Sequence, residues 1–289
     1  MRLLLLACLV SATVLAQKDE FAKVVIKVIP VAGTVSMLQG EGGNIGVSVG
    51  EDGIVIVDDE FAPLAPKIQQ ALKGLSSRPV KFLINTHWHG DHTGGNEILP
   101  QGAPILAQVN VRKRLVEDPE HKLGKKGWPV VTFEEGLSVW ANGEEIQVFH
   151  LPPGHTDGDS VILFKKSNVA HLGDDFFNGL FPFIDLKSGG SVKGYAANVK
   201  TLIAKLPANA KLIPGHGEVG TLKDLQSFSN MLEDVIARVE TGIRAGKTLA
   251  QLKTEKLLAP YAKYAWDVDN DSFMEMLYTG LSGAKAPKP

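Results

Sequence analysis

The chain is organised around residues 85–96, which read Asn-Thr-His-Trp-His-Gly-Asp-His-Thr-Gly-Gly-Asn. Within six positions this stretch holds three histidines and one aspartate, namely His87, His89, Asp91 and His92. Imidazole nitrogens and carboxylate oxygens are ligands that suit zinc and, less selectively, iron or manganese. On a loop, the first two histidines can point at one ion while Asp91 and His92 point at a second. The stretch therefore predicts a loop that supplies ligands to two metal ions.

Three later residues of the same ligand types stand at the ends of predicted strands or in turns. His155 lies in the turn Pro-Pro-Gly-His, Asp174 follows an apolar run, and His216 lies in Pro-Gly-His-Gly. Each is flanked by glycine or proline, which fixes the direction of the backbone and lets a loop approach an ion closely. A lone histidine in such a loop is more often structural or solvated. These residues therefore support a metal site only together with the first cluster.

Hydrophobic periodicity predicts an alternation of strands and helices. The predicted strands are 24–30, 34–38, 44–49, 54–57, 82–84, 105–108, 138–140, 146–150, 161–164, 169–172 and 212–213. The predicted helices are 63–75, 109–117, 192–206, 221–245, 249–258 and 273–281. Apolar residues in 221–245 recur at three- and four-residue steps, which predicts one face of a long amphipathic helix that packs on the core.

The first sixteen residues predict a secretory signal peptide. Arg2 precedes an apolar run that reaches Ala16, and we expect cleavage after Ala16. The run is too short to span a bilayer, so we expect no stable membrane insertion after cleavage. Cys8, the only cysteine, lies in this segment, and its lipidation is disfavoured because the apolar run before it is short. The pattern predicts an exported protein, periplasmic or secreted, with no disulfide.

Length and charge narrow the class of protein. The chain has 289 residues, enough for one large domain with its own core. No break in composition indicates a linker, so residues 17–289, including the C-terminal helices, are expected to form a single domain. The formal net charge is −2 and the basic residues do not cluster, which disfavours a nucleic-acid partner.

The order of these motifs resembles the metallo-β-lactamase superfamily, which includes glyoxalase II and lactonases. The shared pattern is His-x-His-x-Asp-His at residues 87–92, followed by Gly-His155, Gly-Asp174 and Gly-His216-Gly. It spans nearly the whole chain after the signal peptide. The resemblance implies a catalytic domain of the α+β class, a four-layer αββα sandwich, with two metal ions in a groove at the sheet edges.

The resemblance also implies a role for each ligand. The expected sets are His87, His89 and His155 on the first ion, Asp91, His92 and His216 on the second, and Asp174 bridging the two. Asp91 is the expected catalytic residue, because it can orient the nucleophile or receive its proton. Asp58 matches the buried aspartate of the family that braces the metal loop, although an ordinary strand-end aspartate is the alternative. If Asp174 is not the bridge, Asp175 is the next candidate.

The implied function is a binuclear zinc hydrolase whose bridging hydroxide opens a cyclic amide, lactone, ester or thioester of a small acyl substrate. Iron or manganese are the alternative metals. β-Lactamases of the family carry a cysteine where this chain has Asp174, and often a lysine where it has Phe177. These departures disfavour a dedicated β-lactamase and resemble glyoxalase II and lactonases more closely.

Three alternatives stay open beside this hydrolase. One is a glyoxalase II-like thioesterase, and another is an oxidoreductase with a single iron, similar to the persulfide dioxygenases of the superfamily. The third is a metal-binding module without turnover, which a complete ligand set argues against. The aromatic run 176–183, with four phenylalanines, forms either a wall of the substrate groove or ordinary core, and Trp88 has the same two interpretations.

Overall fold

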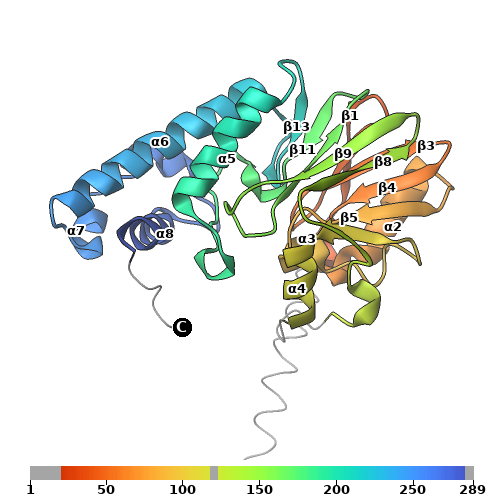
Figure 1. Cartoon of the computed structure of the whole chain (residues 1–289), viewed down its shortest axis with the longest axis horizontal. Coiled ribbons are helices and arrows are strands. Elements are labelled where there is room, and N and C mark those ends of the chain that lie inside the picture. Colours follow the sequence, from red (N-terminus) through yellow and green to blue (C-terminus); the bar gives the residue numbers. More distant parts are fainter. Residues whose placement is uncertain (1–20, 118–122, 284–289) are drawn as a thin grey trace, which may run out of the picture.

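The chain forms two β-sheets in this computed structural model, which describes residues 21–117 and 123–283; helices α5 to α8 extend to one side of the sheets (Figure 1). The first sheet has seven strands that lie side by side in chain order. Neighbours from β1 to β4 are antiparallel and neighbours from β4 to β7 are parallel. The strands are β1 Lys27–Ala32, β2 Val35–Gln39, β3 Ile45–Gly50, β4 Gly53–Val57, β5 Val80–Ile84, β6 Ile105–Gln108 and β7 Val131–Phe133.

The second sheet has six strands in the order β15-β13-β11-β10-β9-β8. The run from β8 to β11 is antiparallel, whereas β13 runs parallel to β11. The strands are β8 Gly136–Ala141, β9 Glu144–His150, β10 Ser160–Phe164, β11 Val169–His171, β13 Lys211–Ile213 and β15 Gly220–Thr221. A separate parallel pair joins β12 (Phe177–Asn178) to β14 (His216–Gly217).

Helices cover the outer face of each sheet. Helix α2 (Ala65–Leu75) buries Ile68 and Leu72 against the first sheet. Helices α5 (Val192–Lys205) and α6 (Leu222–Arg244) pack on the second sheet, and α8 (Asn270–Ser282) packs against these two helices. Between the sheets lies a core that takes side chains from both, such as Val57 and Ile162. This order of layers confirms the predicted αββα sandwich.

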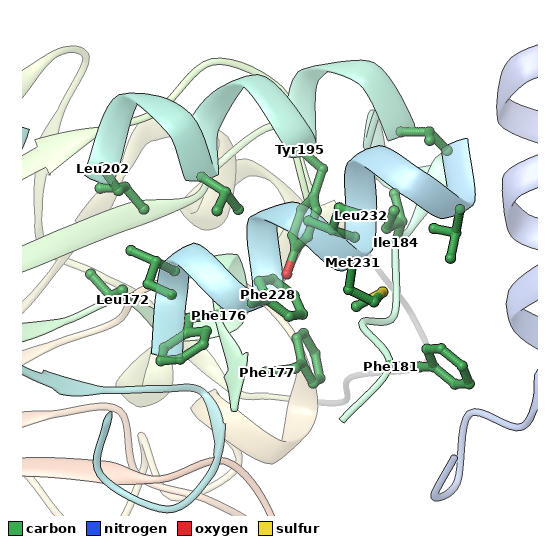
Figure 2. Packing of buried hydrophobic residues seen from close by; sticks show 14 of the residues in the cluster. Leu172, Phe176, Phe177, Phe181, Ile184, Tyr195, Leu202, Phe228, Met231 and Leu232 are labelled. Carbon is green, nitrogen blue, oxygen red and sulfur yellow. The ribbon is translucent and has the colours of Figure 1, made fainter. Parts of the chain in front are cut away.

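Helix α6 follows the predicted amphipathic stripe. Its first turn is capped by Asp224, whose carboxylate accepts the Thr221 amide at 2.9 Å. Figure 2 shows Phe228 and Met231 on the buried side of the helix, close to Tyr195 of α5. The rings of Phe228 and Tyr195 meet edge to face with centroids 6.2 Å apart. The apolar face therefore joins α6 to α5 and to the second sheet below them.

The other predicted elements match with few changes. The helix expected over 249–258 ends earlier, because α7 spans Leu249–Thr254 and Lys256 then takes a positive φ of 52°. The first strand begins at Lys27 and not at residue 24. Four strands of two or three residues, β7, β12, β14 and β15, were too short for the pattern to indicate.

Two observations concern the membrane prediction. Within the residues that the structure describes, no helix combines the length and the apolar character that a bilayer crossing needs. The predicted signal peptide, residues 1–16, lies outside the described residues.

Candidate metal centre

The loop of residues 85–96 is closed by its own end residues. The side-chain amides of Asn85 and Asn96 donate to each other's carbonyl oxygens at 3.1 Å in both directions. Between them, the short helix α3 (Gly90–Thr93) begins one residue after His89. The loop begins at the buried end of β5, and the contact between Asn85 and Asn96 fixes the two ends of the segment that contains the ligands.

Asp58 braces this loop from the end of the neighbouring strand β4. The fully buried carboxylate accepts the Thr86 amide at 2.7 Å and the Thr86 hydroxyl at 2.6 Å. Its Oδ2 also lies 2.8 Å from Nδ1 of His92. A proton on Nδ1 shared with Asp58 leaves Nε2 of His92 free to bind a cation. The predicted bracing role of Asp58 is therefore confirmed by its contacts.

The first ligand group brings together residues from three separate loops. Nδ1 of His89 lies 3.1 Å from Nε2 of His87 and 2.9 Å from Nε2 of His155. Oδ2 of Asp174 lies 3.4 Å from Nε2 of His155 and 3.8 Å from Nε2 of His87. Zinc–nitrogen bonds of ~2.0–2.1 Å in a tetrahedron separate the ligand atoms by ~3.3 Å. The spacing of these four atoms fits that geometry.

The second ligand group lies on the other side of Asp174. Oδ2 of Asp91 is 3.4 Å from Nε2 of His92 and 3.2 Å from Nε2 of His216. Oδ1 of Asp174 is 3.1 Å from His92 Nε2 and 3.6 Å from His216 Nε2. The two carboxylate oxygens of Asp174 thus face different groups. The structure brings together all seven predicted ligands, with Asp174 between the two sets.

Two buried atoms in this cluster have no hydrogen-bond partner among the described residues, Nε2 of His92 and Oδ1 of Asp174. Burying such groups without a partner is costly unless a cation or proton joins them. A third grouping of Asp58, His87 and His92 is also close enough to hold an ion. However, both Asp58 oxygens already accept hydrogen bonds, so the two groups around Asp174 fit a pair of divalent ions better.

The protonation of the two groups differs. Burial holds the pKa of His87 and of His155 below the usual range, so both imidazoles are neutral, the form that binds metals. Burial also lowers the pKa of His216, but the Asp174 and Asp91 carboxylates outweigh it and raise that pKa to about 9. Binding of a cation to the second group must therefore release a proton.

Residues outside the ligand motifs also form hydrogen bonds to the ligands. Asp185 lies 3.0 Å from Nε2 of His89, and its Oδ1 accepts the Lys187 and Ser188 amides. Burial would raise the pKa of Asp185, but the hydrogen bonds from His89 and Ser188 hold it well below its usual range. Its position before Leu-Lys-Ser-Gly indicates a turn, yet nothing local indicates a contact to a histidine 96 residues away.

Two backbone contacts also orient the ligands. Nδ1 of His155 lies 2.8 Å from the Phe183 carbonyl, which directs Nε2 into the first group. The Tyr195 hydroxyl donates to the Asp174 carbonyl at 2.8 Å. Asp175, the alternative bridge, belongs to neither group. Burial raises its pKa well above the usual range, so it is neutral and poorly suited to replace Asp174.

The four phenylalanines divide between the two predicted roles. Phe176 and Phe181 are core residues. Phe177 is buried but stacks on the ring of His216, with centroids 5.0 Å apart. Phe183 is 41% exposed, and its ring centroid lies 5.9 Å from that of His89. Trp88 packs against helix α4 (Val109–Glu117), so of its two predicted roles it has that of a packing residue under the loop.

Comparison with known proteins agrees with this geometry. The family described as "Metallo-beta-lactamase superfamily" matches residues 38–216. A hydroxyacylglutathione hydrolase of Nitrosococcus oceani is 34% identical over 60% of this chain and 59% of the relative. A metallo-beta-lactamase type 2 of Bacteroides fragilis is 24% identical over 54% of this chain and 61% of the relative. The chain thus spans about three fifths of the length of these two curated relatives.

Solved structures show the same fold. A metallo-beta-lactamase from Pontibacter korlensis superimposes with a TM-score of 0.60 and 21% identity. The superposition covers 72% of this chain and 99% of the other.

Proposed function

This chain belongs to the metallo-beta-lactamase superfamily and is a metallo-hydrolase, and we propose that it holds two zinc ions and opens an acyl bond. The observation that carries the proposal is the position of Asp174, whose two oxygens face two complete ligand groups. When bound, two such ions lower the pKa of a shared water and polarise the carbonyl that the water attacks.

Asp91 is the proposed catalytic residue. Its side chain is 25% exposed, whereas His92 and Asp174 beside it are buried. Asp91 also lines the groove that leads to the ligands. Its free oxygen can therefore accept a hydrogen bond from the attacking water and hold the water proton as the acyl bond opens. His92 and His216 fix the other oxygen of Asp91 at 3.4 and 3.2 Å.

The substrate is proposed to be a small acyl compound, an ester, lactone or thioester. One relative is named for hydroxyacylglutathione and another for β-lactams. The position of Phe177 weighs against β-lactams as preferred substrates, because its ring stacks on His216 where a lysine would otherwise bind a carboxylate. We also propose that residues 1–16 direct export of the chain. Mass spectrometry of the protein from a periplasmic or secreted fraction tests this, because cleavage after Ala16 would give a chain that begins at Gln17.

Metal content and turnover test the proposal together. Full-length protein produced with zinc, iron and manganese available would be purified and assayed by elemental analysis. The same preparation would be incubated with para-nitrophenyl esters, lactones, a glutathione thioester and a β-lactam. About two zinc ions per chain and hydrolysis of at least one ester, lactone or thioester support the proposal. A single iron with oxygen consumption would replace it with the oxidoreductase alternative.

A further inference from the structure

The groove above the metal ligands has aromatic walls. It has a volume of about 610 Å³ and reaches His89, Asp91, Asp174 and His216. The aromatic residues that line it are Phe21, Phe61, Phe177, Phe183 and Trp266. Trp266 lies 5.1 Å from the ring of His216, centroid to centroid, so one wall stands directly beside the second ligand group. A substrate that reaches the ligands must therefore lie against aromatic faces.

A second cavity continues this groove away from the ligands. Its volume is about 520 Å³, and it shares Phe183, Asp267 and Val268 with the first cavity. It extends between residues 183–187 and helix α8, where Met276 contributes to its lining. Because three residues line both cavities, the two are adjacent, and together they offer room for a chain attached to the reacting carbonyl.

The mouth of this groove carries unpaired negative charge. Glu41 and Asp267 are exposed, and neither carboxylate has an ion-pair or hydrogen-bond partner within the described ranges. Glu275 in the second cavity is neutralised in part by Lys253 at 3.4 Å. Lys187 is the one lysine or arginine that lines either cavity in the described part of the chain. The charge near the ligands therefore opposes an anionic chain on the substrate.

We propose that this groove selects acyl substrates whose chain beyond the scissile bond is apolar and carries no negative charge. The inference rests on the proposed hydrolase function, and it assigns Asp267 and Glu41 to substrate selection. Aromatic and aliphatic walls gain free energy from each methylene that leaves water. A carboxylate on the same chain would meet Asp267 at close range. Metal ions held by the two ligand groups would polarise the ester carbonyl of each of these substrates.

Three para-nitrophenyl esters with chains of equal length test the selection. One is the hexanoate, one ends in a trimethylammonium group, and one is the half ester of adipic acid, which ends in a carboxylate. Zinc-loaded full-length protein is expected to show kcat/KM about tenfold lower for the anionic ester than for the neutral one. Asp267→Lys should reduce this ratio about fivefold or more. Glu135→Lys, an exposed charge change outside the groove, should leave it unchanged.

Each outcome decides one of the two proposals. Equal rates for the three esters, or a ratio that Asp267→Lys does not move, would overturn the selection but leave the hydrolase intact. If no ester, lactone or thioester is hydrolysed, the proposed hydrolase fails, and binding alone then tests the groove. Octyltrimethylammonium or octanesulfonate would be added to the protein while tryptophan fluorescence is recorded. The Trp266→Phe variant would show which part of the signal comes from Trp266. Tighter binding of the sulfonate would overturn the inference, and tighter binding of the cation would support it.

Discussion

Replacing Asp58 by asparagine should weaken the binding of the second metal ion while keeping the fold. Asp58 has a positive φ of 61°, a conformation that asparagine tolerates well, so the backbone need not move. The change acts on the carboxylate oxygen that contacts both the Thr86 hydroxyl and Nδ1 of His92. An amide nitrogen in that place would donate a hydrogen bond to Nδ1, so Nδ1 would have to be the unprotonated nitrogen. His92 must then carry its own proton on Nε2, the atom that faces Asp91 and Asp174.

The expected loss of metal affinity and of stability in Asp58→Asn follows from these contacts. A buried hydrogen bond to a charged group contributes about 1.5–3 kcal/mol, and the variant weakens at least one of them. Loss of such an outer partner of a metal-binding histidine typically lowers metal affinity ~10–100-fold. The affinity for the first ion is expected to fall less, because His87 contacts Asp58 through the Thr86 hydroxyl, at 3.0 Å from Nδ1 of His87, and His89 and His155 have other partners. We therefore expect one tight ion and one weak ion per chain.

Competition with a zinc chelator and urea unfolding of the metal-free protein measure the two effects. Asp59→Asn is the matched control, because Asp59 is equally buried but, among the described residues, its side chain accepts a hydrogen bond from the Gly95 amide alone, at 2.8 Å. Burial raises the pKa of Asp59 well above its usual range, so an uncharged amide resembles its native state. The reasoning is refuted if Asp58→Asn binds two zinc ions as tightly as the unchanged protein, or if the two variants behave alike.

Three further predictions concern single carboxylates. Asp91→Ala should lose at least ~100-fold in kcat while circular dichroism stays unchanged, and near-normal turnover would contradict its catalytic role. Asp174→Ala should retain about one zinc ion, because three imidazoles remain on the first group, and two tightly bound ions by elemental analysis would exclude a bridge. Burial raises the pKa of Glu60 to about 7, against hydrogen bonds from the Gly42 and Glu41 amides. Folding therefore favours protonated Glu60, so the free energy of unfolding should fall as pH rises from about 4.5 to about 7. Glu60→Gln should flatten this part of the urea-unfolding profile, and an unchanged slope would contradict the argument.

The parts of the site that the sequence could predict are those encoded locally. Four ligands lie within six residues, and the glycine-flanked positions of His155, Asp174 and His216 follow predicted strands or turns. Helix α6 was predictable for the same reason, since its apolar period persists over six turns and tertiary packing only reinforces it. In each case the signal and the structure that it specifies occupy the same stretch of chain.

The contacts that the sequence could not predict join residues far apart in the chain. The parallel pair β12–β14 sets Phe177 beside His216 and has only two residues in each strand, too few for any period to show. Asp185 reaches His89 across 96 positions, and its own neighbourhood indicates only a turn. Such contacts depend on where two loops meet, which is settled by the packing of whole layers and not by local preference.

Glycines make this metal centre compact in a way that spacing alone does not reveal. A Cβ atom at Gly43 would overlap the imidazole of His92, and one at Gly215 would overlap Oδ1 of Asp174. Nε2 of His92 and Oδ1 of Asp174 are also among the buried side-chain atoms that have no hydrogen-bond partner in the described part of the chain. Any side chain at either glycine must displace a proposed ligand that belongs to the second group. Gly43 and Gly215 therefore leave the space that His92 and Asp174 occupy. Because neither glycine has a side chain, two loops that are distant in the sequence can both pack against this pair of ligands.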